Sequence, residues 1–219
     1  MNDYPAVIIP IYRNRDYLDQ LISRLPRSLH SHTIFIDDGS DDGSGDYLRR
    51  IGFHCICFPR NRGKGEALTA GWREAARRGY RSVIQIDGDL QHPPEKIIQF
   101  FTHPRELKYG YRIRRRSMPI HRKLSNFFTS LLISVRTGKV LKDSQCGFRG
   151  YHLQSVQALK FRERHFHLES EMAIKLGLQG IKFVPVPLPT VYGHEPSAIH
   201  PFRDTFEFVF LWFRSYFWT

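Results

Sequence analysis

Cysteine is scarce in this sequence. Its 219 residues contain only Cys55, Cys57 and Cys146. An odd number of cysteines, without a CxxC pair or a Cys/His cluster, argues against both a disulfide framework and a zinc site. This usage is typical of a reducing compartment, and we expect a cytoplasmic protein.

Long hydrophobic runs are also lacking. The longest stretch without a charged residue covers residues 124–135. At about 1.5 Å per residue it is too short for a bilayer core of about 30 Å, and we interpret it as a core helix. Residues 1–5 carry no positively charged region ahead of an apolar one, so we expect no signal peptide.

Acidic residues are outnumbered. Asp and Glu total 21 against 33 Lys and Arg, which gives a formal net charge of +12. This excess predicts an anionic partner, and nucleic acid, the diphosphate of a nucleotide and an acidic membrane surface all qualify. The usual phosphate-binding loops are missing, because the segment around Lys64 lacks the spacing of a P-loop and no GxGxxG occurs. We interpret that segment as a tight turn in which Lys64 contacts a nucleotide.

The chain does contain a regular alternation of apolar strands and helices. Apolar runs predict strands at 6–11, 33–36, 54–58 and 81–87, and helical spacing predicts helices at 16–25, at 45–51 and in the segment that Gly79 ends. This order predicts an α/β fold with a mostly parallel central sheet flanked by helices. Its ligand crevice should lie beyond the carboxyl ends of the strands.

Polar side chains follow two of these strands where each strand ends. They are Asp37 and Asp38 after the second strand, and Asp87, Asp89 and Gln91 after the fourth. Residues i and i+2 share a side of an extended chain, and carboxylate and amide oxygens suit Mg²⁺. We expect Gly88 to bend the chain so that Asp89 and Gln91 converge on one ion, and to leave room for a ligand. Solvated turn acids, and helix capping by Asp37 or Asp38, remain the alternatives.

The second half of the chain is more basic. After a helix that follows Pro94, an arginine cluster runs to residue 116, and Pro119 then opens a helix with Arg122 and Ser125 in its first turns. Guanidinium groups and free helix N–H groups both suit phosphate oxygens, although solvated surface is the alternative for the cluster.

Three further segments follow. Residues 143–151 indicate a structured turn, and a helix begins at His167 with Glu169 spaced to pair with Lys or Arg. For Glu171 a surface position and a site role are equally compatible with the sequence. Residues 183–187 predict an edge strand, because their prolines cannot donate to a β-ladder.

The C-terminus is aromatic on nearly every side. Residues 202–218 must therefore be buried against the domain, pack on a partner or lie in a membrane interface. With Arg203 and Arg214 flanking the aromatic residues, we favour interfacial attachment and place a partner helix next. We accordingly predict a catalytic domain at 1–200 and an amphipathic aromatic helix at 201–219.

In order and spacing these motifs resemble the family 2 glycosyltransferases of the GT-A type, and within them the dolichyl-phosphate mannosyltransferase branch. The resemblance covers most of the chain. The residues that carry it are Val7-Ile8-Ile9-Pro10 with Tyr12, Asp37-Asp38-Gly39-Ser40, Asn61-Arg62-Gly63-Lys64-Gly65 with Ala67 and Gly71, the block 87–95, Gly110-Tyr111-Arg112, Arg122 with Ser125, Asp143 with Cys146-Gly147-Phe148-Arg149, and Glu169-Ser170-Glu171-Met172.

The resemblance implies a GT-A fold, a GDP- or UDP-linked sugar as donor and Mg²⁺ or Mn²⁺ as cofactor. The donor would be held by Pro10, Tyr12, Asp37 and Asp87, and the metal by Asp87, Asp89 and Gln91. Arg112, Arg122 and Ser125 would handle phosphate groups. We add Asp38, Lys64 and Gly88 to the donor site, add Arg114 and Arg149 to the acceptor-phosphate site, and expect Asp89, Arg112 and Arg122 to be catalytic. The tyrosine is followed by Arg13-Asn14, where the family usually has Asn-Glu.

Together, residues and resemblance predict a metal-dependent, inverting glycosyltransferase that moves a hexose to polyprenyl phosphate, of the dolichyl or undecaprenyl type. A lipid acceptor would place the protein peripherally on the cytoplasmic face of an anionic membrane, or beside a membrane partner. The alternatives are a glycan or other hydroxyl acceptor, a non-catalytic anion- or nucleic-acid-binding protein, and a catalytically silent scaffold. No nucleic acid is expected, because a nucleic-acid-binding module gives no reason for carboxylates at strand ends.

Overall fold

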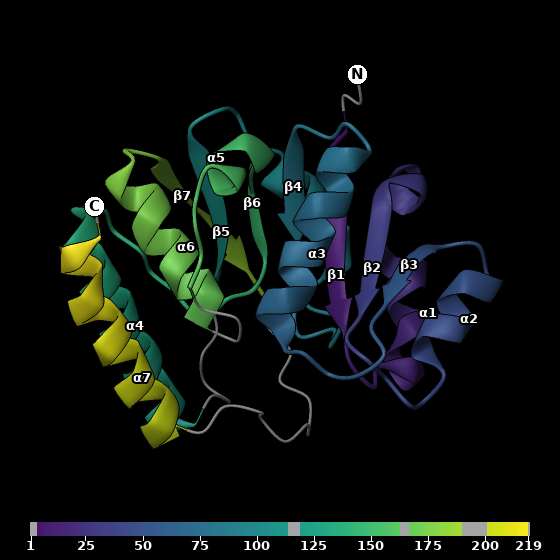
Figure 1. The fold of residues 1–219 in the computed structure, drawn as a ribbon, viewed down its shortest axis with the longest axis horizontal. Helices are drawn as coiled ribbons and strands as arrows, with labels where there is room; N and C mark the ends of the chain where they lie inside the picture. Colours follow the sequence, from purple (N-terminus) through teal and green to yellow (C-terminus); the bar gives the residue numbers. More distant parts are fainter. Residues whose placement is uncertain (1–3, 114–118, 163–166, 190–200, 219) are drawn as a thin grey trace.

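A central sheet with helices on both faces forms the body of the molecule (Figure 1). The computed structural model describes residues 4–113, 119–162, 167–189 and 201–218, with only the backbone described at 201–206. The sheet has the strand order β3-β2-β1-β4-β6-β5-β7. Its strands are β1 (Ala6–Ile11), β2 (Thr33–Asp37), β3 (His54–Cys57), β4 (Ser82–Gln85), β5 (Glu106–Arg112), β6 (Arg149–His152) and β7 (Lys182–Leu188).

The sheet is mostly parallel, as expected. Neighbouring strands pair in parallel from β3 through β4, and so do β5 and β7. Only β6 runs the other way, between β4 and β5. Six of the strands therefore end at one end of the sheet, which we call the carboxyl end, and β6 begins there.

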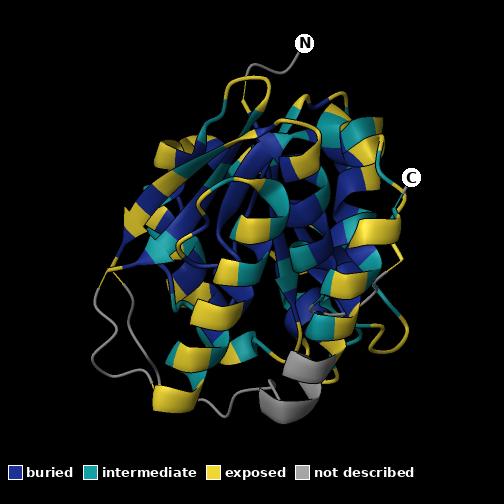
Figure 2. Ribbon diagram, turned by 90° about the vertical axis from the view of Figure 1, so that its left-hand side faces the viewer, coloured by how far each residue is buried: buried dark blue, intermediate teal, exposed yellow. Residues whose placement is uncertain are grey.

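The helices are α1 (Arg15–Arg24), α2 (Ser44–Arg50), α3 (Lys64–Arg77), α4 (Ile120–Thr137), α5 (Leu153–Gln157), α6 (His167–Leu178) and α7 (Pro201–Arg214), with 3₁₀ helices η1 (Arg27–His32), η2 (Pro94–Phe100) and η3 (Ser215–Phe217). Alternate residues of β1 enter two different cores. Ala6 and Ile8 pack with α3 and α6, whereas Val7 and Ile9 pack with α1 and η2. Figure 2 shows the buried strands between helices whose outer sides are exposed.

The four predicted N-terminal strands and the edge strand β7 are confirmed, whereas two segments differ. The helix after Pro94 is the 3₁₀ helix η2, and the turn expected at 143–151 ends in strand β6. The sequence Arg149-Gly150-Tyr151-His152 has no apolar run that would predict a strand. It forms one because β6 pairs with β4 on one side and with β5 on the other, and these neighbours bury it.

Helices α4 and α7 lie side by side and run in the same direction at one side of the molecule (Figure 1). Trp212 Nε1 donates to Leu132 O (2.7 Å), and Arg136 Nη2 donates to Ser215 O (2.8 Å). Of the three interpretations of the C-terminal helix, burial against the domain holds for one of its faces, where Phe208 and Leu211 are buried. No helix in the described part of the chain is long and apolar enough to cross a bilayer.

The expectation that residues 124–135 form a core helix is wrong for half of that helix. One face of α4 is buried, but Leu124, Phe127, Phe128 and Val135 are each more than half exposed. The sequence pattern misled because the buried face of α4 is mostly polar, with Asn126, Thr129 and Ser130 beside Ile133, and most of its apolar residues point outward.

Candidate active site

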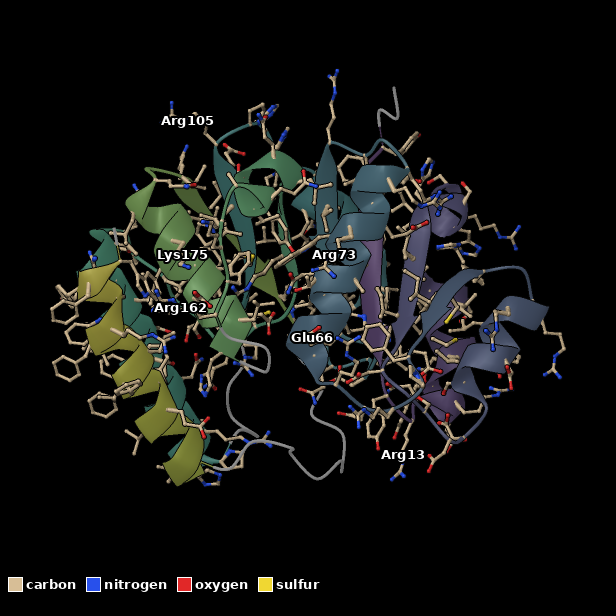
Figure 3. The ribbon with its side chains drawn as sticks, in the orientation of Figure 1. Arg13, Glu66, Arg73, Arg105, Arg162 and Lys175 are labelled. Carbon is tan, nitrogen blue, oxygen red and sulfur yellow. The ribbon has the colours of Figure 1, made fainter. Side chains whose placement is uncertain are left out.

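The loops at the carboxyl end of the sheet bring the predicted donor and metal residues together. The loop after β1 links the two acidic loops: Arg13 N donates to Ser40 Oγ (2.8 Å), and Asn14 Nδ2 reaches Gly88 O at 3.5 Å. Arg13 also makes a two-pronged ion pair with Asp41, with both distances 2.7 Å. In Figure 3, Arg13 lies at this end and Arg105 at the opposite one. The pair Arg13-Asn14 thus ties three strand ends together.

Backbone strain concentrates at this end. Among the described residues, the non-glycine residues with positive φ are Arg13 (54°), Leu90 (58°) and Arg105 (66°), and the first two lie in the site loops. Such conformations cost free energy and persist where the surroundings enforce them. Tyr12, next to Arg13, is 41% exposed, and its backbone N–H donates to Asn14 Oδ1 (2.8 Å).

The two acids after β2 are both buried and have different partners. Asp38 accepts from Arg62 N (2.7 Å) and Gly63 N (2.8 Å), and so it holds the loop that leads into α3. Burial raises the pKa of Asp38, although these two N–H groups oppose the shift. Asp37 accepts from Ser40 N (2.9 Å). Asp38 therefore has a structural task, and its expected contact with a nucleotide stays a prediction.

Lys64 is shared by two carboxylates at the start of α3. Its Nζ lies 2.6 Å from Asp87 Oδ1 and 2.9 Å from Glu169 Oε2. Burial disfavours the charged lysine, but the two carboxylates outweigh burial and raise the Lys64 pKa. Burial likewise disfavours the charged Asp87, but Lys64 outweighs it and lowers the Asp87 pKa. Lys64 and Asp87 are thus held in their charged forms.

A buried hydrogen-bond chain fixes Glu169 from the sheet side. Gln85 Nε2 donates to Glu169 Oε1 (2.6 Å), and Tyr151 OH donates to Gln85 Oε1 (2.5 Å). Trp72 Nε1 in turn donates to Tyr151 OH (2.7 Å). The pairing expected for Glu169 is confirmed. Glu171, in contrast, is buried and pairs with Lys175 at 2.7 Å.

The loop predicted to hold the metal turns at Gly88 and Asp89, shortly after β4, and bends again at Leu90. Leu90 carries the left-handed φ, and Asp89 Oδ1 accepts from Gln91 N (3.1 Å). A Cβ at Gly88 would lie 2.8 Å from Ile11 Cγ2. The turn expected at Gly88 is therefore present, and the missing side chain of Gly88 also lets the loop pack on the end of β1. The room that we expect for a ligand beside Gly88 stays a prediction.

Arg112 forms a second buried ion pair at this end of the sheet. Its Nε and Nη2 each donate to Asp143 at 2.7 Å, and Asn126 Nδ2 donates to Asp143 Oδ1 (2.9 Å). Between this pair and Asp87 lies His92, whose Nε2 is 3.3 Å from Cys146 Sγ. Burial lowers the pKa of His92 to about 4 and raises that of Cys146 to about 12.

The other arginines predicted to bind phosphate occupy different environments. Arg149 is fully buried and donates to three carbonyl oxygens, those of Cys146 (3.1 Å), Ser144 (2.6 Å) and Glu169 (2.7 Å). It therefore holds the loop before β6 and the start of α6 in place. These three hydrogen bonds account for a buried arginine at this position without any contact to a phosphate. Arg122 is half-buried in the first turn of α4. Arg114 lies outside the described residues.

Ser125 and Pro10 complete the predicted set. Ser125 Oγ accepts from Gln145 Nε2 (3.2 Å), so Ser125 contacts the loop before β6. Pro10 is half-buried within β1, one residue before the strand ends. Their expected contacts with phosphate and with the donor stay predictions.

A divalent ion fits the donor chemistry of this loop only with help from a ligand. No three His, Cys, Asp or Glu side chains of the described residues lie close enough to hold a metal on their own. Asp87, Asp89 and Gln91 offer hard oxygens, and Mg²⁺ commonly combines one or two carboxylates with substrate phosphates and water. The ammonium of Lys64 on Asp87 also shows that this position accommodates a cation.

Sequence reasoning did not assign site roles to Gln85, His92, Asn14 and Asp143. For Gln85 the signal was present, because a polar residue stands between Ile84 and Ile86 in a strand buried on both faces. Its partners Tyr151 and Glu169 come from distant parts of the chain, so the spacing of residues could not connect them.

Comparisons with known proteins agree with this geometry. Residues 6–160 match the model of glycosyl transferase family 2. The chain is 24% identical to UDP-N-acetylglucosamine–dolichyl-phosphate N-acetylglucosaminyltransferase of Methanococcus voltae, over 88% of this chain and 87% of that protein. It is 26% identical to undecaprenyl-phosphate mannosyltransferase of Micrococcus luteus, over 84% of this chain and 82% of that protein.

A third relative and a solved structure extend the comparison. Undecaprenyl-phosphate 4-deoxy-4-formamido-L-arabinose transferase of Proteus mirabilis is 30% identical over 70% of this chain, which spans 50% of that protein. Glucosyl-3-phosphoglycerate synthase of Mycobacterium tuberculosis has the same fold, with a TM-score of 0.70 and 21% identity over 95% of this chain and 78% of that one. The fold is thus GT-A, and the chain belongs to glycosyl transferase family 2, in which its relatives include polyprenyl-phosphate glycosyltransferases.

Proposed function

We propose that this glycosyltransferase moves a hexose from a nucleotide-diphosphate sugar to polyprenyl phosphate by a metal-assisted, inverting displacement. The observation that carries the proposal is that Asp37, Asp87, Asp89 and Lys64 all lie at the carboxyl end of the sheet, where Lys64 pairs with Asp87. The printed names of the relatives from Methanococcus voltae and Micrococcus luteus specify dolichyl or undecaprenyl phosphate as acceptor.

The donor would lie across the loops after β1, β2 and β4. The exposed ring of Tyr12 can stack on the base, and Asp37 closes the end of β2. The base, uracil or guanine, is a matter for measurement. The structural neighbour was crystallised with Mn²⁺ and UDP-glucose, which makes UDP the first nucleotide to test.

The metal would be held by Asp89 and Asp87 with Gln91. When bound it supplies Lewis-acid stabilisation of the charge on the departing diphosphate. Asp89 would contribute its carboxylate directly. Lys64 neutralises Asp87 in the absence of ligands, and Glu169 keeps the ammonium of Lys64 in place.

In the transfer step, a phosphate oxygen of the acceptor forms a bond to the anomeric carbon while the bond from that carbon to the diphosphate oxygen breaks. The nucleoside diphosphate leaves, and a single displacement inverts the anomeric centre. The acceptor oxygen is already anionic, so no side chain has to remove a proton. Arg122, Ser125 and Arg114 would attract the phosphate, whereas Arg112 is neutralised by Asp143 and would orient rather than attract.

The acceptor test uses the purified chain with labelled nucleotide sugar, Mn²⁺ and polyprenyl phosphate. We expect label in the lipid fraction, and we expect Asp89→Asn to abolish its metal-dependent formation. Label found only in soluble saccharides would contradict the lipid acceptor and would indicate transfer to a hydroxyl acceptor instead. Binding of RNA or DNA without nucleotide-sugar turnover would contradict both.

A further inference from the structure

Helices α4 and α7 together present a large apolar surface to solvent. We call it the outer face and define it by Leu124, Phe127, Phe128, Leu131 and Val135 of α4 with Phe210, Phe213 and Phe217 of the C-terminal segment. These side chains are between 44% and 82% exposed. Single exposed apolar residues are ordinary, but a contiguous group of this size marks an interaction site.

The polarity of α4 is inverted relative to a helix that packs on a core. Its buried face carries Asn126, Thr129 and Ser130, which bond to Asp143 and Ser144. Its outer face carries the phenylalanines and leucines at the helical spacing i, i+3, i+4, i+7. Burial within this chain accounts for Ile133 and part of Leu132, but it does not explain the exposed apolar residues of α4.

The two helices form one continuous surface. Trp212 donates to the backbone of α4, and the guanidinium of Arg136 lies 4.5 Å from the centre of the Tyr216 ring. Phe208 and Leu211 hold the opposite side of α7 in the domain core. In Figure 3 the rings of the C-terminal helix extend away from the sheet on the outside of the molecule.

Charge selects the kind of partner. Helix α4 contains no acidic residue, and its first turn carries His121, Arg122 and Lys123. Helix α7 carries two acids, Asp204 and Glu207, and Glu207 is engaged by His167 Nε2 at 3.2 Å. An apolar and aromatic face with cations at its end complements an anionic bilayer, into which Phe, Leu and Trp side chains insert while Lys and Arg meet the headgroups.

We propose that the outer face binds the surface of an anionic lipid bilayer. Both helices begin on the side of the molecule where the carboxyl end of the sheet lies (Figure 1), so a bound bilayer would lie beside Arg122 and Ser125. The biological reason for such binding rests on the proposed function: a bound bilayer would give a lipid-linked acceptor access to the site. Binding to vesicles needs no turnover, so the two proposals can fail separately.

Vesicle sedimentation tests the inference. The full chain should co-sediment with vesicles of phosphatidylcholine and phosphatidylglycerol and bind pure phosphatidylcholine less. The double variant Phe127→Ser/Phe213→Ser should weaken binding to the mixed vesicles by about tenfold or more, because two inserted rings are lost. Ile98→Ser is the matched control, since Ile98 is 60% exposed but lies on η2. It should bind like the unchanged chain.

A second measurement needs no variant. Trp212 and Trp218 lie on the C-terminal segment beside the outer face, so bromine-labelled lipids in mixed vesicles should quench part of the tryptophan fluorescence. No sedimentation and no quenching with mixed vesicles would overturn the proposal. So would a chain that is dimeric without lipid and becomes monomeric in the double variant, because the outer face would then join two copies.

Discussion

Lys64 is held by Asp87 and Glu169 together, so Glu169 would influence the proposed metal site without touching the ion. We predict that Glu169→Gln lowers kcat/KM for the nucleotide sugar by about tenfold to a hundredfold, as expected for a residue that orients a ligand-binding group. The KM for Mn²⁺ should rise, because Asp87 would hold Lys64 alone. Glu169→Asp should restore part of the activity.

The control for this variant lies two residues further along the same helix. Glu171 is buried and pairs with Lys175, away from Lys64. Glu171→Gln should lower the free energy of unfolding without changing the KM for Mn²⁺. Equal changes of that KM in both variants would show that the effect comes from general loosening of α6.

His92 makes stability depend on pH. Its pKa is lowered by burial from 6.5 to about 4, so below pH 6.5 the unfolded chain binds the proton more readily than the folded one. The stability that the neutral ring contributes is complete above about pH 6.5 and is lost as the pH falls toward 4. We predict a loss of about 2 kcal/mol in the free energy of unfolding between pH 7 and pH 5.

Urea titrations at the two pH values measure this loss. In His92→Gln the difference between them should shrink by about that amount. His103→Gln, at an exposed histidine, should leave the difference unchanged. If both variants keep the full difference, other groups cause the acid sensitivity.

At the scale of elements, sequence analysis found the strands in which buried apolar residues follow one another directly along the chain. Strand β1 and the centres of β2 and β4 carry consecutive apolar residues, because helices cover both faces of the sheet. Strand β6 was missed, since pairing with β4 and β5 supplies its burial. Helix α4 was found at the predicted residues, but its apolar face was wrongly assigned to the core. Apolar content alone does not say whether such a face points toward a core or away from it.

The candidate site divides in the same way. Asp37 and Asp87 could be brought together from sequence, because the carboxyl ends of parallel strands meet. The partners of Lys64 could not, since Glu169 is 105 positions away and reaches the site through the fold of α6. The tasks of Asp38 and Arg149 depend on backbone groups, to which residue spacing gives no guide.

Helix α7 carries a prediction of its own. Phe208 is 2% exposed among residues of α4, α6 and β5, whereas Phe210 is 67% exposed. Phe208→Ala should lower the free energy of unfolding by about 3 to 5 kcal/mol, as a buried phenylalanine does. Phe210→Ala should change it by no more than about 0.5 kcal/mol. Urea unfolding measures both.

The same experiment tests the predicted division into units 1–200 and 201–219. A single transition that moves with Phe208→Ala would make α7 part of the catalytic domain's cooperative core. If Phe208→Ala has as little effect as Phe210→Ala, α7 is an appendage and the division stands.

At the scale of the whole molecule, where the net charge is +12, two groups of cations lie in different environments. One group of cations, Lys64 and Arg112, is already paired with carboxylates inside the site. Another, in the first turn of α4, borders the outer face. Only the second group is placed to attract a membrane, so raising the salt concentration should weaken vesicle binding more than donor binding.

Donor binding should stabilise the entire fold, because the site joins the loops after β1, β2 and β4 and is tied through Lys64 and Glu169 to α6. At a nucleotide concentration about 100 times its Kd, linkage adds about 2.7 kcal/mol, which raises Tm by about 5 to 10 °C for a chain of this size. We predict this shift with Mn²⁺ and either UDP or GDP, and the nucleotide that gives the larger shift identifies the base. Chelation with EDTA, or Asp89→Asn in the presence of Mn²⁺, should remove most of it, because the diphosphate and the carboxylates repel each other without the ion. A shift that is the same with and without metal would mean that the nucleotide is held by its base and by Lys64 alone, and the metal would then have no part in donor binding.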